Sequence, residues 1–219
     1  MDAVSLLIAV ASGRDPKPAF TQALSRMFAW CARELPEGSK VDIGFLGYYD
    51  TAQARRKLTA RAIAHQDTHI LFIDDDMDFP YRAAHRLLEH DKDIIGANYT
   101  SRFYPPQPLA VKDMKFISSR GRSGIEKVDH VPTGLMLIKT AVFAKLEKPY
   151  FESPALEDGD DGMSDDVYFC RKARKAGFDV WVDHDLSMEV QHIGQIGFNH
   201  AMVAEPEPGW RVTAEELFG

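Results

Sequence analysis

The sequence predicts an α/β protein with one mostly parallel sheet flanked by helices and a smaller antiparallel part in the C-terminal half. Two observations lead to this prediction. Up to Ala97, apolar runs of strand length alternate with helical patterns, which is typical of parallel strands joined by helical crossovers. After Thr100, prolines and short runs replace this alternation and indicate antiparallel strands.

The first half of the chain carries the clearest strand and helix patterns. Apolar runs, typical of strands buried on both faces, predict strands over residues 4–10 and 69–73. Further strands are predicted over residues 41–46 and 93–97. Apolar residues at helical spacing predict helices over residues 16–35, 51–65 and 80–89. Pro80 opens the last of these helices, where a missing N–H is tolerated.

The second half is expected to begin with short antiparallel strands and a polar loop, followed by longer elements. Its predicted strands are 109–111, 114–118, 133–138, 180–182 and 189–193, with a polar, glycine-bearing loop at 118–124. A helix is expected over 164–176, because apolar residues recur on one side and Gly177 stops the pattern.

Length and composition favour one ordinary globular domain. The chain has 219 residues, with 45% hydrophobic and 27% charged residues, and it shows no repeat or linker. Its net charge of −7 disfavours a surface dedicated to nucleic acid or anionic membrane. The N-terminus lacks the charge order of a signal peptide and is too short to span a bilayer, so we expect a cytoplasmic protein without a membrane span. Cys31 and Cys170 lie in apolar patterns and are expected to be buried thiols.

The strongest chemical signal is the acidic cluster Asp74-Asp75-Asp76, directly after a predicted strand. Ligands of open parallel sheets bind beyond the carboxyl ends of the strands. Carboxylates crowded at such a place repel one another unless a hard divalent cation binds them. Asp74 and Asp76 can converge on one ion, because alternate residues of an extended segment point the same way. The alternative is an exposed acidic turn before a helix N-terminus.

Residues 69–80, HILFIDDDMDFP, resemble the Asp-X-Asp signature of GT-A fold glycosyltransferases, in the broad family-two-like group of bacteria and phages. Ala54-Arg55-Arg56 resembles the family's Ala-Arg-Asn element, with Arg in place of Asn. Residues 132–137, PTGLML, are similar to its small-Gly-apolar strand, and residues 164–166, SDD, to its Glu-Asp pair that opens a helix. His192-Ile193-Gly194 is similar to its His-X-Gly. Together these elements cover residues 4–194 in the family's order.

The resemblance implies one GT-A glycosyltransferase domain over 1–219. Its nucleotide-sugar-binding half would cover about 1–100, its acceptor and catalytic half about 101–200, and a C-terminal extension 201–219. The donor would be a nucleotide sugar, expected to be a UDP-sugar, with Mn²⁺ or Mg²⁺ as cofactor. The implied metal ligands are Asp74, Asp76 and His192. The implied donor-binding residues are Arg55, Asp74, Asp75 and Gly134, with Asp75 the least necessary of the acidic cluster.

Asp165 and Asp166 are the implied catalytic pair, although capping of a helix would explain either one. In the family the second acid acts as general base toward the acceptor hydroxyl, which implies that role for Asp166 and an inverting displacement. Asp165 stands where the family usually has Glu, and it would contact the donor sugar or orient the loop. A carboxylate near a diphosphate is expected to have a raised pKa, which suits proton abstraction.

Several alternatives stay open. Arg55 could pair with phosphate or carboxylate in the cleft, or lie on a solvated helix face. Gly134 could admit close backbone approach to the site, or only allow tight packing. The acidic segment 157–162 could be a lid that orders on donor binding, or a solvated run of charge.

The acceptor is the least defined part of the prediction. Segment 112–127 carries an excess of basic residues and lies close in sequence to Arg102, Phe103 and Tyr104; its basic residues are Lys112, Lys115, Arg120, Arg122 and Lys127. Such a surface could bind an anionic acceptor, including phage DNA with hydroxymethylated pyrimidines, or be an ordinary polar hairpin. The sequence does not identify the acceptor, for which a glycan and modified DNA are the candidates. The competing functions are a catalytically inert nucleotide- and metal-binding module and a nucleotidyltransferase. The latter is disfavoured because no glycine-rich phosphate loop follows Val10.

Overall fold

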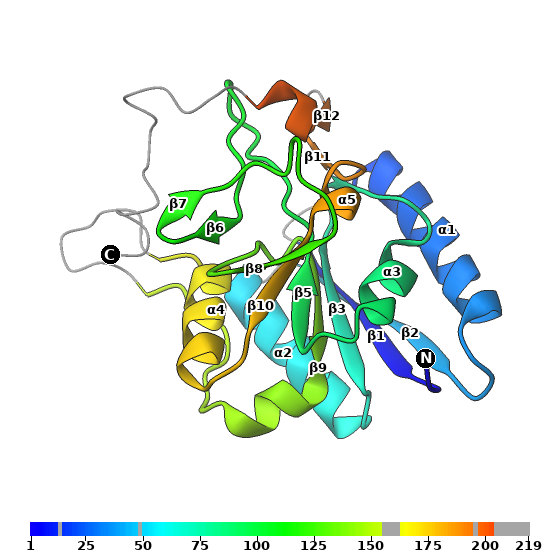
Figure 1. Cartoon of the computed structure of the whole chain (residues 1–219). Coiled ribbons are helices and arrows are strands. Elements are labelled where there is room, and N and C mark those ends of the chain that lie inside the picture. The colour runs from blue at the N-terminus through cyan, green and yellow to red at the C-terminus, as the bar shows by residue number, and fades with distance from the viewer. Residues whose placement is uncertain (13–14, 48–49, 155–162, 195–196, 204–219) are drawn as a thin grey trace.

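The computed structural model describes residues 1–12, 15–47, 50–154, 163–194 and 197–203. A seven-stranded sheet in the order β2-β1-β3-β9-β5-β10-β8 forms its centre (Figure 1). Its strands are β1 (Ser5–Ser12), β2 (Lys40–Gly47), β3 (His69–Asp74), β5 (Ile94–Gly96), β8 (Ile125–Val128), β9 (Leu135–Lys139) and β10 (Val180–Asp183). Strands β2, β1, β3, β5 and β10 share one direction, whereas β9 and β8 run against their neighbours.

Helices cover both faces of this sheet. The α-helices are α1 (Pro18–Glu34), α2 (Thr51–Ala64), α3 (Ala83–Glu89), α4 (Asp165–Lys175) and α5 (His184–Ser187), and the 3₁₀ helices are η1 (Thr140–Lys145) and η2 (His200–Met202). Side chains of α2, α4 and η1 share one hydrophobic cluster with one face of the sheet. Side chains of α1, α3 and α5 form the second cluster on the other face.

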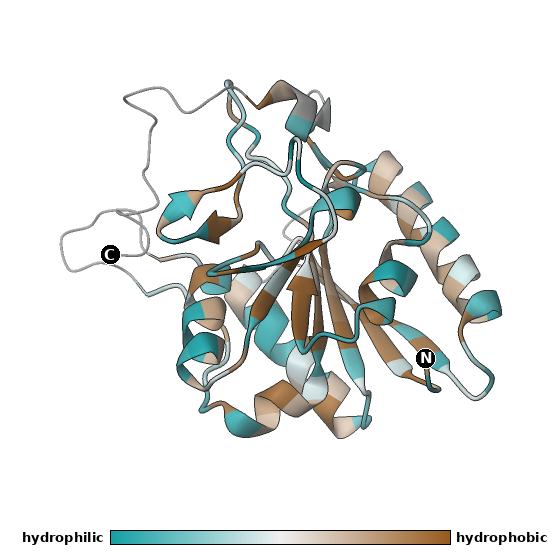
Figure 2. Cartoon of the chain, viewed as in Figure 1, coloured by the Kyte–Doolittle hydropathy of each residue, from teal (hydrophilic) through white to brown (hydrophobic). Residues whose placement is uncertain are grey.

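Strand β1 shows why the central strands carry apolar side chains on both faces. Leu7 and Ala9 belong to the cluster on one face, and Leu6 and Ile8 to the cluster on the other. Figure 2 shows the resulting band of hydrophobic strands between more polar outer helix faces. A strand covered on both faces has no polar side, which is the pattern that the sequence displays.

Two small antiparallel sheets complete the fold. One joins β4 (Met77–Asp78), β11 (Gln191–Ile193) and β12 (Gly197–Phe198), and the other joins β6 (Val111–Lys112) to β7 (Lys115–Phe116). In the first, His192 pairs with Met77 and Gln191 with Asp78. This sheet therefore brings the late segment around His192 back to the acidic cluster after β3.

The predicted α/β class, with a mostly parallel sheet and a smaller antiparallel part, is confirmed. Helix α3 begins at Ala83 rather than Pro80, because residues 80–82 form a turn in which the Ala83 N–H donates to the Pro80 carbonyl. Cys31 and Cys170 are free and buried, as predicted. The acidic segment 157–162 and most of the predicted extension 201–219 lie outside the described residues. None of the helices in the described ranges is both long enough and apolar enough to cross a membrane.

Candidate active site

The acidic cluster forms the tight connection between β3 and β4, with Asp74 as the last residue of β3. Asp75 and Asp76 are only 5% and 4% exposed. This burial contradicts the alternative of an exposed acidic turn. Buried carboxylates require partners, so the contacts of each aspartate define what the site can do.

The backbone of the cluster is fixed from three directions. The Asp74 N–H donates to the Gly134 carbonyl at 3.2 Å, and the Ile193 N–H donates to the Asp76 carbonyl at 2.7 Å. The Lys17 N–H, just before α1, donates to the Asp75 carbonyl at 3.0 Å. The Asp75 side chain accepts a hydrogen bond from the hydroxyl of Ser12 at the end of β1. Asp75 is therefore held toward β1.

Arg55 of α2 joins Asp74 to Asp165. Its Nη1 lies 2.6 and 2.7 Å from the two carboxylate oxygens of Asp165, and its Nη2 lies 2.8 Å from Oδ1 of Asp74. The Arg55 side chain is 5% exposed, so the alternative of a solvated helix face is wrong. Burial alone would lower the pKa of Arg55. The carboxylates of Asp74, Asp165 and Asp166 raise it by more than burial lowers it, so the guanidinium stays charged. Arg55 thus fixes β3 against the beginning of α4.

His192 faces Asp76 in a defined orientation. Nδ1 of His192 lies 2.8 Å from the carbonyl oxygen of Thr100, and a carbonyl only accepts, so Nδ1 carries the hydrogen. The opposite nitrogen, Nε2, lies 3.4 Å from Oδ1 of Asp76. Metal-binding histidines are typically oriented in this way, with the second nitrogen donating to a carbonyl or carboxylate. The Tyr99 ring packs edge-on against the imidazole, with centroids 5.1 Å apart.

The other oxygen of Asp76 is bound by Arg102. Nη1 of Arg102 lies 2.5 Å from Oδ2 of Asp76. The structure thus brings Asp76 and His192 together, while the side chain of Asp74 is bound by Arg55. Within the described part of the chain, no group of three or more His, Cys, Asp or Glu side chains is arranged to hold a metal ion. Ligation by Asp74, Asp76 and His192 together stays a prediction.

Asp166 lies at the first turn of α4 in a basic and hydrogen-bonded environment. Its Oδ1 accepts from the Ser164 hydroxyl at 2.5 Å and from the Val167 N–H at 2.8 Å. Nε2 of His130 lies 3.6 Å from its Oδ2. Burial would raise the pKa of Asp166, but His130, Arg55 and the Ser164 hydroxyl together hold it well below the usual value. These neighbours favour the ionised form, so the pKa of Asp166 is lowered in the ligand-free chain. The expected rise beside a bound diphosphate stays a prediction.

Gly134 is packed against a tyrosine. Its N–H donates to the hydroxyl oxygen of Tyr99 at 3.0 Å, and a Cβ at this position would lie 2.4 Å from that oxygen. Burial raises the pKa of the Tyr99 phenol well above 10, so the hydroxyl stays neutral. Tight packing therefore accounts for this glycine, and Tyr99 connects it to His192.

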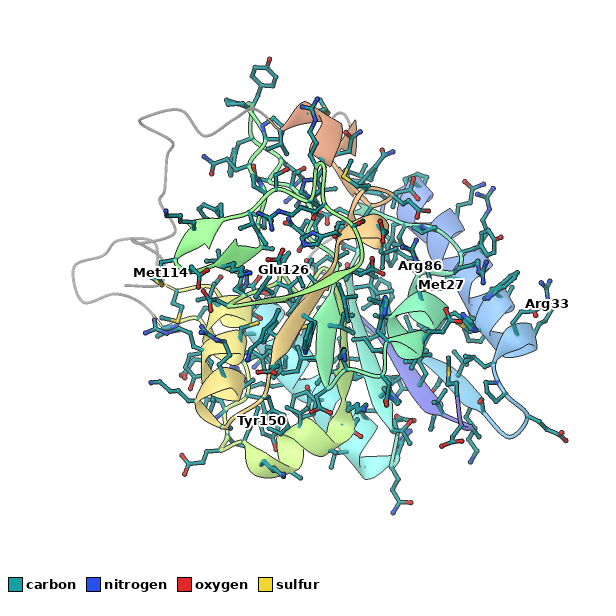
Figure 3. The ribbon with its side chains drawn as sticks, in the orientation of Figure 1. Met27, Arg33, Arg86, Met114, Glu126 and Tyr150 are labelled. Carbon is teal, nitrogen blue, oxygen red and sulfur yellow. The ribbon has the colours of Figure 1, made fainter. Side chains whose placement is uncertain are left out.

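The basic segment is largely compensated by acidic side chains. Glu126 lies on β8 (Figure 3). Its carboxylate is 2.5 Å from Nζ of Lys112 and 2.7 Å from Nη1 of Arg122. Lys127 pairs with Asp179 at 2.5 Å. These pairs favour the interpretation of the segment as an ordinary polar hairpin over a dedicated anion-binding surface.

Ser12, Tyr99 and His130 are site residues that sequence reasoning missed. Ser12 ends β1, and Tyr99 follows β5, so both lie at the edge of the sheet where the acidic cluster was predicted. The rule that placed the cluster there could have identified them. His130 lies between β8 and β9, and its pairing with Asp166 depends on packing that no local pattern signals.

No protein-family model matches this chain, and no curated protein matches its sequence. Among solved structures, A197 from STIV is similar with a TM-score of 0.58 at 14% identity, covering 87% of this chain and 86% of that chain. The catalytic domain of Drosophila β1,4-galactosyltransferase 7, in complex with xylobiose, gives a TM-score of 0.46 at 17% identity. That match covers 90% of this chain and 71% of the other. The similarity to A197 shows a shared fold.

Proposed function

We propose that this chain is a metal-dependent glycosyltransferase that moves a sugar from a nucleotide-sugar donor, expected to be a UDP-sugar, to an acceptor hydroxyl. The observation that carries this proposal is the pair of His192 and Asp76 at the carboxyl end of β3. An imidazole nitrogen facing a buried carboxylate at this edge of the sheet is half of a metal site. The ordered resemblance of residues 4–194 to GT-A glycosyltransferases supports the same function.

Asp76 and His192 offer a carboxylate and an imidazole, two types of ligand that divalent cations bind. Asp76 and His192 would hold Mn²⁺ or Mg²⁺, with Asp74 contributing directly or through water. When bound, the ion would supply Lewis-acid stabilisation of the charge that develops on the departing nucleoside diphosphate. The imidazole in the donor set favours Mn²⁺ mildly. Arg55 and Gly134 fix Asp74 through its side chain and its backbone, and so they orient the donor-binding edge.

Asp166 is the proposed general base. Its carboxylate is ionised at neutral pH, and an ionised carboxylate can accept the proton of the acceptor hydroxyl. The lowered pKa makes Asp166 a weaker base than a carboxylate with a raised pKa, so the proposed role rests on its position at the first turn of α4. The neighbouring His130 has Nδ1 at 3.1 Å from the Leu109 carbonyl, so its Nε2 is directed at Asp166. Direct displacement by a hydroxyl activated in this way inverts the anomeric centre. Asp165, bound by Arg55, positions the first turn of α4 beside the donor.

One observation favours a second candidate, an inert nucleotide- and metal-binding module. Arg55 and Arg102 already neutralise Asp74 and Asp76, which is the task otherwise given to a metal. The two candidates differ in turnover, since only a transferase releases UDP from its own donor. The DNA-directed alternative keeps the same donor site and differs only in its acceptor.

Calorimetric titration of UDP, with and without Mn²⁺, tests the metal site. Mn²⁺ is expected to increase UDP affinity in the wild type, and Asp76→Asn and His192→Ala are expected to abolish most of that increase. Asp42→Asn, which removes a 59%-exposed carboxylate on β2, is the matched control and should behave as wild type. If Asp76→Asn and His192→Ala retain the full effect of Mn²⁺, the metal-site assignment is wrong.

Slow hydrolysis of UDP-sugars tests the chemistry without a known acceptor. The wild type is expected to release UDP from one sugar of a panel. Asp166→Asn should reduce that release by about 10²-fold or more, the usual contribution of a general base, while UDP binding is retained. An absence of UDP release from every sugar, with Mn²⁺-dependent binding intact, would favour the inert module.

A further inference from the structure

Arg102 is bound to the same carboxylate that the proposed metal requires. Its Nη1 lies 2.5 Å from Oδ2 of Asp76, while Nε2 of His192 lies 3.4 Å from Oδ1 of that carboxylate. We propose that Arg102 exchanges partners during donor binding. It neutralises Asp76 in the free protein and binds the diphosphate of the donor when the metal takes Asp76. This inference rests on the proposed function and adds a phosphate-binding residue to its site.

The exchange follows from charge. A guanidinium and a divalent cation on one buried carboxylate lie close enough to repel each other, so the metal and Arg102 compete for Asp76. A diphosphate carries the acceptor oxygens that a guanidinium binds best. The donor therefore offers Arg102 a new partner at the moment when the metal displaces it.

In the loop of residues 101–107, hydrogen bonds join the two ends, while the residues between them can move. The Ser101 N–H donates to the Gln107 carbonyl at 2.8 Å, and the Gln107 N–H donates to the Ser101 hydroxyl at 3.0 Å. Beyond this base, Phe103 and Tyr104 are 63% and 83% exposed. The Arg102 side chain itself is 34% exposed. It can turn within the site without opening a packed core.

Arg55 provides the contrast that identifies Arg102 as the mobile cation. The Arg55 side chain is 5% exposed and is bound to both Asp74 and Asp165. Its departure would leave two carboxylates uncompensated, only one of which is a proposed metal ligand. Departure of Arg102 uncovers only the oxygen that the metal would neutralise. Arg55 therefore stays in place, and Arg102 exchanges.

The same segment also orients the imidazole. The carbonyl of Thr100, two residues before Arg102, accepts from Nδ1 of His192 at 2.8 Å. One short stretch after β5 thus fixes the direction of the proposed nitrogen ligand and carries the cation that competes for the oxygen ligand. The prediction that follows is an effect of Arg102 on metal and nucleotide binding in opposite directions.

Two affinities test this prediction. Mn²⁺ affinity without nucleotide is measured from the electron paramagnetic resonance signal of free Mn²⁺, and UDP affinity at saturating Mn²⁺ is measured by calorimetry. Arg102→Ala and Arg102→Gln are expected to bind Mn²⁺ alone about tenfold more tightly and UDP at saturating Mn²⁺ about tenfold more weakly, a typical coupling between sites. Arg33→Ala, on α1 (Figure 3), removes the same charge from an exposed pair with Glu34 and should change neither affinity.

The outcomes separate this inference from the proposed function. If Asp76→Asn abolishes Mn²⁺ binding but neither Arg102 variant binds Mn²⁺ more tightly than wild type, the metal site stands and the exchange is wrong. If Mn²⁺ affinity rises while UDP affinity is unchanged, the transfer of Arg102 to the diphosphate is overturned. If the wild type binds neither Mn²⁺ nor UDP, the proposed function fails and the exchange fails with it.

Discussion

At the scale of single residues, Arg55 shows how a buried charge can organise a site. Among the described residues it is the one Arg or Lys that is buried, and its two carboxylate partners come from β3 and α4. Removing one member of a buried ion pair leaves the other charges without compensation, which is far more destabilising than loss of a surface pair. The residue is therefore expected to matter to folding as well as to binding.

Arg55→Ala is predicted to lower the free energy of unfolding by about 3–5 kcal/mol, because Asp74 and Asp165 stay buried without their cation. Urea denaturation measures the change. Arg61→Ala is the matched control on the same helix, since Arg61 pairs with the 59%-exposed Asp42. The control should change stability by less than about 1 kcal/mol. If the two variants lower the free energy of unfolding equally, the ion pairs of Arg55 stabilise the protein no more than a surface pair does.

The two cysteines are predicted to be unreactive in the folded protein. Burial raises the pKa of Cys31 to about 11 and that of Cys170 to about 12. The thiolate is the reactive form, so iodoacetamide at pH 8 should label neither residue within the time that labels a free thiol. In concentrated guanidinium chloride both should react, as read by mass spectrometry. Rapid labelling of the native protein would contradict the buried positions.

At the scale of elements, the beginning of β9 is constrained by Tyr99. Gly134→Ala is predicted to destabilise the protein by about 1–3 kcal/mol, because the new methyl group would overlap the phenol. Gly47→Ala at the end of β2 is the control, since among the described residues a Cβ there meets only the Ser12 carbonyl, at 3.8 Å. Thermal denaturation compares the two variants. A tolerated Gly134→Ala would mean that Tyr99 can move away without loss.

Glu126 connects strand β8 to its neighbours. Its carboxylate contacts Lys112 and Arg122, and it lies 2.9 Å from Nε2 of His184 in α5. Burial alone would raise the pKa of Glu126, but hydrogen bonds from Lys112 and His184 and the charge of Arg122 lower it from 4.5 to about 2. The folded pKa lies below the unfolded one. The carboxylate therefore stabilises the fold above pH 4.5, and this contribution is lost as the pH falls toward 2.

Glu126→Gln is accordingly predicted to lower the free energy of unfolding by about 1–2 kcal/mol at pH 7, the usual value for hydrogen bonds to a charged group. The difference from wild type should shrink between pH 4.5 and pH 2. Urea denaturation of both proteins at a series of pH values measures this difference in the free energy of unfolding. A difference that is constant across this range would show that the charge of Glu126 contributes nothing.

At the scale of the whole molecule, the sequence was most informative where one local pattern determines burial. The strands around Ile8 and Leu71 are apolar at every position between their two end residues, because helices cover both faces of the sheet. Strand β8 was missed because Glu126 and Lys127 make it look like a polar loop, although it pairs with β10 along one edge. Edge strands have no such pattern, since only part of their surface is covered.

The candidate site also has features that a local sequence pattern predicts and features that depend on packing. The position of the acidic cluster could be predicted, because Asp74 directly follows a buried strand. The partners of its carboxylates could not be predicted, because Arg102 reaches Asp76, and His130 reaches Asp166, across long separations in the chain. The lowered pKa of Asp166 in the ligand-free chain could not be predicted for the same reason, because its direction depends on neighbours that only the packed chain supplies.

The place of β9 in the sheet has a consequence for biosynthesis. Strands β3 and β5 lie on either side of β9, which follows both of them in the chain. While the chain emerges from the ribosome, β3 and β5 each expose a row of unpaired N–H and C=O groups until residue 139 is available. Such late, long-range pairing slows folding and leaves nascent chains prone to self-association. The edge of the sheet around Asp74 thus forms only after the segment that carries Gly134 has been made.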